Sequence, residues 1–147
     1  MYSVLILWAP ESTENKKIVE TIARAFDESK ITPLVKKAAE TSIVDINAAD
    51  IVVFGAQKSG NGDVPAEYAE LVRVFRGVTL AGRTAGFFSM GPEKCSVKLR
   101  KALRDTEIAQ LDDDPLFADQ RDGVPPDVAE WVRKLVTAHQ ELKYVGE

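Results

Sequence analysis

The chain has 147 residues, which is enough for one domain with a core of normal size, and its formal net charge is −4 at pH 7. Hydrophobic residues make up 45% of it and charged residues 29%, so a disordered chain is excluded. The slight acidic excess argues against a nucleic-acid partner, because phosphate backbones require a basic surface. One cysteine and one histidine exclude an internal disulfide and metal sites built on several of these residues. With no apolar run long enough to cross a bilayer, we expect a single cytoplasmic domain over residues 1–147 and no membrane partner.

The first half of the chain alternates between apolar runs and a helical pattern. Residues 4–9 form an unbroken apolar run before Pro10, which is typical of a strand buried on both faces. The polar stretch 11–15 leads into a helix with one apolar face, made of Ile18, Ile22, Ala25 and Phe26. A short second strand is expected to begin at 33–35, and the apolar run 49–55 predicts a third.

The second half continues the alternation. Turn-forming residues at 56–63 are followed by Pro65, which suits the first turn of a helix that Gly77 ends. The remaining expected elements are a fourth strand at 83–89, a basic helix at 94–103, a weaker fifth strand at 107–111 and an amphipathic terminal helix at 127–142. Short apolar strands that alternate with helices predict an α/β fold, with helices on both faces of a parallel sheet.

In such sheets, ligands bind outside the carboxyl ends of the strands. The sequence therefore directs attention to three loops, at residues 10–16, 56–63 and 89–95. This inference rests on architecture and holds for any ligand.

The same segments resemble a short-chain flavodoxin over nearly the whole chain. Residues 4–16 resemble that family's first strand and phosphate loop, where the usual Ser/Thr-x-Thr-Gly-Asn-Thr is replaced by Glu11-Ser12-Thr13-Glu14-Asn15-Lys16. Residues 49–55 resemble the strand that leads into the flavin loop, and 64–68 the helix start after it. Residues 111–115 and 127–131 resemble the last strand and helix. The resemblance implies a three-layer flavodoxin-like sandwich, with a five-stranded parallel sheet in the order 2-1-3-4-5.

The resemblance also implies FMN as a cofactor. Its phosphate would lie at the start of the first helix, and its ring between the loops around Ser59 and Met90. The implied cofactor-binding residues are Ser12, Thr13, Asn15, Lys16, Gln57, Lys58, Ser59, Gly60, Ser89, Met90 and Gly91.

Two interpretations of the first loop stay open. Unpaired N–H groups at a helix start, nearby hydroxyls and the charge of Lys16 suit a phosphate monoester. Glu11 and Glu14 instead place carboxylates there, and Glu14 replaces the family's glycine. In the alternative, Ser12 or Thr13 only caps the helix, with Glu14 favoured by its dipole.

The other two loops are also open to two interpretations. Gly60 and Gly62 permit the backbone turn that the family uses beside its flavin ring. The family often has an aromatic residue that stacks on the ring, and this sequence has none in the matching loops. Met90 could cover a ring face instead, or could simply fill the core.

Several other residues favour plain structural roles. Asp112-Asp113-Asp114 is interpreted as a solvated turn rather than a metal site, and Cys95 as an inert thiol rather than a reactive one. His139 is expected to be exposed near the end of the last helix. Core packing is expected for Trp8 and Trp131, and a solvated helix face for the basic cluster Lys94, Lys98, Arg100, Lys101 and Arg104.

Two classes of function are excluded by missing residues. A response-regulator receiver needs an aspartate after the third strand, where this chain has 54–58 without one. A serine hydrolase needs a Gly-x-Ser-x-Gly elbow, which the sequence lacks. Two hypotheses remain: an electron carrier that holds FMN weakly and serves an unidentified redox partner protein, rather than an enzyme with its own substrate, or a cofactor-free flavodoxin-like interaction or regulatory module.

Overall fold

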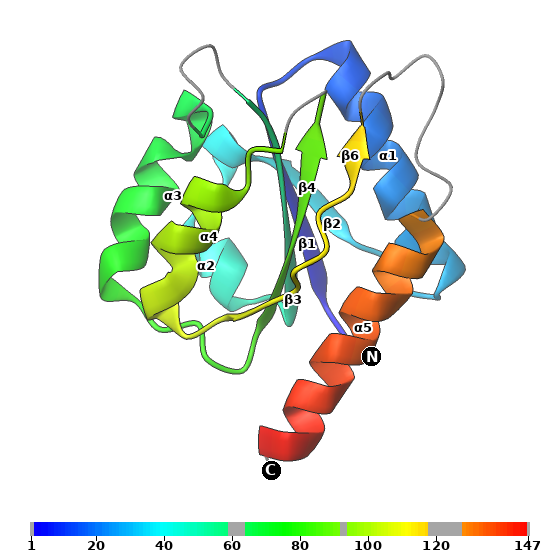
Figure 1. The fold of residues 1–147 in the computed structure, drawn as a ribbon, viewed down its shortest axis with the longest axis vertical. Helices are drawn as coiled ribbons and strands as arrows, with labels where there is room; N and C mark the ends of the chain where they lie inside the picture. Colours follow the sequence, from blue (N-terminus) through cyan, green and yellow to red (C-terminus); the bar gives the residue numbers. More distant parts are fainter. Residues whose placement is uncertain (1, 59–63, 92–93, 118–127, 147) are drawn as a thin grey trace.

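The computed structural model describes residues 2–58, 64–91, 94–117 and 128–146. Its central feature is a parallel sheet with the strand order β2-β1-β3-β4-β5, which confirms the expected order 2-1-3-4-5 (Figure 1). One further short strand, β6, pairs with β4 on the same edge as β5. The strands are β1 (Val4–Ala9), β2 (Leu34–Lys37), β3 (Ile51–Gln57), β4 (Thr84–Met90), β5 (Ala109–Gln110) and β6 (Leu116–Phe117).

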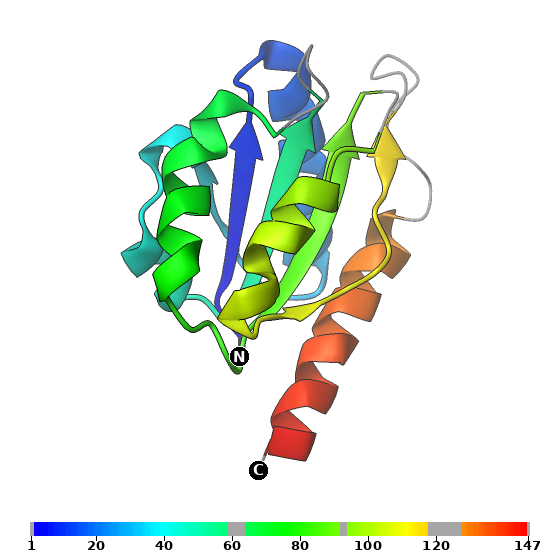
Figure 2. The ribbon, with the colours of Figure 1, turned by 60° about the vertical axis from the view of Figure 1, so that its left-hand side comes forward.

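Helices cover both faces of the sheet and form the two outer layers. Figures 1 and 2 show α1 (Thr13–Glu28) and α5 (Val128–Gly146) side by side on one face. The other face carries α2 (Ile43–Asn47), α3 (Ala69–Val74) and α4 (Val97–Leu103). Short 3-10 turns extend these helices or connect elements at Ala38–Glu40, Ala66–Tyr68, Phe75–Gly77 and Arg104–Thr106. Among the described residues, no helix combines the length and the apolar composition needed to cross a membrane.

The alternation of side chains along the central strands divides the core into two parts. Leu5 and Leu7 of β1 pack toward α3 and α4, whereas Ile6 and Trp8 pack toward α1 and α5. Both sets are buried, because a strand with a helical layer on each face exposes neither side. The unbroken apolar run of the first strand is thus explained by its central position.

The expected fifth strand at 107–111 is present only as the short β5, and β6 follows it as a strand that the sequence did not predict. Leu111 donates its N–H to the carbonyl oxygen of Ala85 at 2.9 Å, and Ser89 donates to the carbonyl of Pro115 at 2.9 Å. Between these bonds the chain leaves the ladder at residues 112–114, so β5 and β6 both pair with β4. Proline has no N–H to donate, and consecutive aspartates are poor strand formers, which accounts for the interruption.

His139 corrects an expectation from the sequence. Its side chain is 0% exposed rather than solvated. Its Nδ1 atom lies 2.9 Å from Oγ1 of Thr84 on β4, and the ring of Tyr2 meets it edge-on at a centroid distance of 4.8 Å. His139 therefore connects the later part of α5 to the start of β4 through a side-chain hydrogen bond.

Candidate functional site

Three chain segments meet at the carboxyl edge of the sheet. In the strand register, Ala9 of β1 lies opposite Ala56 of β3, and Gln57 lies opposite Met90 of β4. The segments that leave β1, β3 and β4 therefore begin side by side, as the parallel topology predicts. Ser59 and Gly60, two of the expected site residues, lie outside the described residues.

The segment after β1 turns sharply into α1. The Ala9–Pro10 peptide bond is cis, and Ser12 is the N-cap residue of the helix. Its Oγ accepts a hydrogen bond from the backbone N–H of Asn15 at 3.0 Å, and its carbonyl accepts one from Lys16 at 3.0 Å. The N–H groups of Thr13 and Glu14 have no intrahelical acceptor, because a helix leaves its first donors unpaired. The helix start thus combines a genuine cap with donors that an anion could use.

Asn15 is buried, and its side chain joins two of the three segments. Its Nδ2 atom donates to the carbonyl oxygen of Pro10 at 3.0 Å and to Oε1 of Gln57 at 3.0 Å. An amide nitrogen carries only two protons, so these bonds use both. The Nδ2 atom of Asn15 therefore holds two segments of the protein together, and the expected role of Asn15 as a cofactor-binding residue stays a prediction.

Gln57 also reaches the segment after β4. Gly91 adopts φ +99°, which glycine tolerates and other residues avoid, and a Cβ built on it would lie 3.5 Å from Nε2 of Gln57. The Gly91 N–H donates to the carbonyl oxygen of Phe117 at 2.7 Å. The structure thus brings the expected residues Asn15, Gln57 and Gly91 together, with Gln57 in the middle.

The side chains of Ser89 and Met90 are buried. Met90 is 0% exposed and packs in the core beside α1 and α5, so its side chain does not cover a ring. Ser89 is equally buried; its Oγ donates to the Asp114 carboxylate at 3.2 Å and accepts from the N–H of Cys95 at 3.1 Å. The expected role of Ser89 and Met90 as cofactor-binding residues stays a prediction, and their burial leaves it to their backbone atoms. Lys58, by contrast, is exposed next to Gln57.

The start of α1 opens onto a cavity of about 440 Å³. It is lined by Trp8, Glu11, Ser12, Thr13, Lys16 and Lys37. Lys37 comes from the end of β2, and its Nζ atom lies 2.7 Å from Oε1 of Glu11. Lys37 was not among the residues expected from the sequence, although its place beside the carboxyl end of β1 follows from the expected strand order once β2 is extended past Val35. Ser12, Thr13 and Lys16 do share one pocket here.

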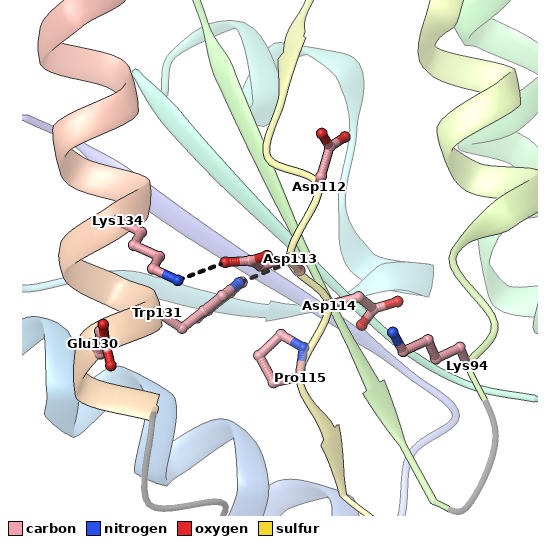
Figure 3. Close-up of a pocket in the computed structure, with 8 residues that line it drawn as sticks. All are labelled: Lys94, Asp112, Asp113, Asp114, Pro115, Glu130, Trp131 and Lys134. Atoms are coloured by element: carbon pink, nitrogen blue, oxygen red, sulfur yellow. Dashed lines mark hydrogen bonds and ion pairs between the residues drawn. The ribbon is translucent and has the colours of Figure 1, made fainter.

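A second cavity, of about 340 Å³, lies where the edge strand is interrupted (Figure 3). Trp131 donates its indole N–H to the carbonyl oxygen of Asp113 at 3.0 Å, and Lys134 pairs with the Asp113 carboxylate at 3.0 Å. Asp114, across the cavity, accepts a hydrogen bond from Ser96 at 2.6 Å. Asp112 and Asp113 are exposed, as expected of a solvated turn, but Asp113 and Asp114 also bond side chains of α5 and of the segment before α4. In the part of the chain that the structure describes, no group of three or more His, Cys, Asp or Glu side chains could hold a metal.

Cys95 and Arg100 of the third loop and its helix have structural contacts. The thiol of Cys95 donates to the carbonyl oxygen of Ala56 at 3.0 Å, and burial raises its pKa. The guanidinium of Arg100 lies 4.3 Å above the ring of Phe87 and donates to the carbonyl oxygen of Leu111 at 2.8 Å. The contacts of Cys95 favour an inert thiol. Arg100, which was expected on a solvated helix face, instead packs on Phe87 and bonds the backbone.

Comparisons with known proteins agree with this architecture. No family model matches the sequence, and no curated protein matches it significantly. Among solved structures, a short-chain flavodoxin associated with a non-canonical PDU bacterial microcompartment superimposes with a TM-score of 0.78 at 14% identity, covering 95% of this chain and 99% of that one. A Streptococcus pneumoniae flavodoxin gives 0.73 at 16% identity, covering 97% and 98%. Oxidised flavodoxin 1 from Bacillus cereus gives 0.72 at 18%, covering 97% of both chains. The chain has the flavodoxin-like fold.

Proposed function

We propose that the protein is an FMN-binding electron carrier whose cofactor phosphate lies at the start of α1. One observation carries the proposal: in a flavodoxin-like fold, Ser12, Thr13 and Lys16 line one cavity at the helix start. The Ser12 hydroxyl keeps its proton for a phosphate while its oxygen accepts from Asn15. When bound, FMN would supply the redox chemistry by accepting and releasing electrons.

The protein's own residues would bind and orient the cofactor. The N–H groups of Thr13 and Glu14, together with the ammonium group of Lys16, would hold the phosphate. The bonds of Asn15 to Pro10 and Gln57 keep the phosphate loop in register with the end of β3, beside which the ring would lie. Because the side chains of Ser89 and Met90 are buried, ring contacts from this segment would come from backbone atoms.

A titration with FMN and with riboflavin, which lacks the phosphate, tests the proposal. We expect saturable quenching of FMN fluorescence and weaker binding of riboflavin. Thr13→Ala should weaken FMN binding by about 1–3 kcal/mol through a lost hydrogen bond to a charged group. Thr137→Ala replaces another exposed threonine, on α5, and is the matched control. It should leave the affinity for FMN unchanged. Absence of saturable quenching at high micromolar FMN would refute the proposal.

The second candidate function is a cofactor-free interaction module. Glu14, in the first turn of α1, favours it because its carboxylate strengthens the helix start and opposes a phosphate. If FMN fails to bind while the protein stays folded, this second function takes precedence.

We also propose a setting for the electron carrier. It would act as one domain in the cytoplasm and exchange electrons with a redox partner protein, without nucleic acid or membrane. The net charge of −4 and the single cysteine support this setting.

A further inference from the structure

Lys37 is a cation that the fold brings to the start of α1 from a different strand. In the parallel pairing of β1 with β2, Lys37 lies opposite Trp8, close to the point where β1 ends. Its ammonium group meets the carboxylate of Glu11, and both side chains line the same cavity as Ser12, Thr13 and Lys16. Two lysines therefore reach this cavity, one along α1 and one across the sheet edge.

The ion pair between Lys37 and Glu11 is exposed enough to exchange partners. The side chains are 40% and 65% exposed, respectively, and water screens the attraction between exposed charges. The hydrogen bond from Lys37 to Glu11 raises the pKa of the lysine, which therefore carries its charge throughout the neutral range. A competing anion of higher charge, held at the same time by other donors, would displace the carboxylate.

A phosphate monoester is such an anion. It carries up to two negative charges and several acceptor oxygens, whereas a carboxylate carries one charge and two oxygens. In the cavity it would also meet Lys16 and the unpaired N–H groups of the helix start.

We propose that Lys37 is a specificity-determining residue of the cofactor site, which exchanges the carboxylate of Glu11 for the phosphate of FMN. This inference rests on the proposed function, since it concerns the same cavity. Glu11 then acts as an internal competitor that occupies Lys37 until the phosphate arrives. Lys37 would thereby favour FMN over riboflavin.

The test compares Lys37→Met with Lys36→Met. Both variants remove one lysine from β2, so they change the net charge equally, but Lys36 pairs with Asp45 at 3.1 Å and does not line the cavity. Dissociation constants for FMN and riboflavin are measured by fluorescence titration at fixed ionic strength, and circular dichroism verifies folding. We expect Lys37→Met to weaken FMN binding about tenfold, as the loss of a charge-assisted hydrogen bond implies, and to leave riboflavin binding unchanged.

Glu11→Gln is the complementary variant. It should tighten FMN binding several-fold, because Lys37 no longer has a carboxylate to release, and should again leave riboflavin unaffected. Equal losses of FMN affinity in Lys37→Met and Lys36→Met would overturn the inference. The effect would then come from the overall positive charge near the site and not from a contact between Lys37 and the phosphate. In that case FMN binding by the unchanged protein would still support the proposed function. Failure of the unchanged protein to bind FMN would overturn both.

Discussion

The Nδ2 atom of Asn15 lies 3.0 Å from Oε1 of Gln57 and joins the first turn of α1 to the last residue of β3. The same nitrogen bonds the carbonyl oxygen of Pro10, so one buried amide fixes the whole turn between β1 and α1. Residues far apart in the sequence thereby hold the phosphate loop and the neighbouring strand end in one arrangement.

Asn15→Ala should lower the free energy of unfolding by about 1–3 kcal/mol, because it leaves two partly buried acceptor oxygens without this donor. Urea unfolding followed by circular dichroism measures the change. Asn47→Ala at the exposed end of α2 is the matched control and should stay within about 0.5 kcal/mol of the unchanged protein. Equal effects of the two substitutions would show that the Asn15 bonds contribute little.

Glu14→Gly separates the phosphate site from a simple helix cap. The substitution removes a carboxylate from the helix start and should improve FMN affinity by about 1 kcal/mol, from the lost like-charge repulsion. Stability should fall by about 1 kcal/mol, because glycine is a poor helix former and the favourable dipole contact is lost. Glu20→Gly, at another exposed position of α1, should lower stability without changing FMN affinity. If Glu14→Gly leaves the affinity for FMN unchanged, the phosphate does not bind at the start of α1.

Gly55 packs directly against the ring of Phe88, which leaves no space for a Cβ atom at this position. A Cβ at this position would lie 2.0 Å from Cζ of Phe88, so Gly55→Ala forces the ring or the strand to move. We expect a loss of about 1–3 kcal/mol, measured by thermal or urea unfolding. A Cβ at Gly77 would meet nothing within 4 Å, and Gly77→Ala should remain within about 0.5 kcal/mol of the unchanged protein. A harmless Gly55→Ala would contradict the packing of Phe88.

Cys95 should react slowly with thiol reagents in the native protein. Burial raises its pKa, and its contact with the Ala56 carbonyl oxygen keeps the sulfur inside. Because it is the only cysteine in the sequence, a chromogenic disulfide reagent reports on this position alone. We expect the rate to rise strongly in denaturing urea. Native and denatured rates of similar size would mean that the thiol is accessible.

Asp45 links stability to pH through the cap of α2. The backbone N–H of Ser42 donates to its carboxylate at 2.9 Å, and this bond, followed by the one from Lys36, lowers the pKa of Asp45 from that of an ordinary aspartate. When a carboxyl has a lower pKa in the folded protein than in the unfolded chain, its ionised form stabilises the fold at any pH above the unfolded-state pKa. This contribution is lost as the pH falls through the folded-state pKa. The stability difference between the unchanged protein and Asp45→Ala should therefore shrink from pH 7 toward pH 2. An NMR titration of the Asp45 carboxyl checks the direction, and a pKa at or above that of an ordinary aspartate would contradict it.

The sequence predicted the fold better than the site, for physical reasons. Buried parallel strands need continuous apolar runs, and those at Val4, Ile51 and Ala85 are unambiguous. The short helix α2 was missed because its five residues are too few for a periodic pattern, although the Ser42 and Asp45 capping box marks its start.

His139 shows why the polarity of immediate neighbours misleads. Gln140 and Glu141 suggest an exposed helix end, but a helical face is set by spacings of three and four. Leu135 and Val132 lie four and seven residues before His139 and are buried, so the stripe that they form contains the histidine. This signal was present in the sequence.

The site was harder to predict because its contacts join distant segments. No local pattern indicates that the Asn15 amide bonds Gln57, or that Lys37 pairs with Glu11. Both contacts depend on which strand ends are neighbours and on where β2 ends. Strand order was predictable, whereas side-chain partners across it were not.

The interruption of the edge strand has a consequence for solution behaviour. β5 and β6 each contribute only 2 residues to the sheet, and residues 112–114 between them carry carboxylates. An incoming strand from another molecule needs a longer straight row of unpaired backbone groups than either piece offers. On the opposite edge, β2 is 4 residues long and ends in Lys36 and Lys37. In the described part of the chain, both borders of the sheet therefore carry features that disfavour pairing with a strand of another molecule.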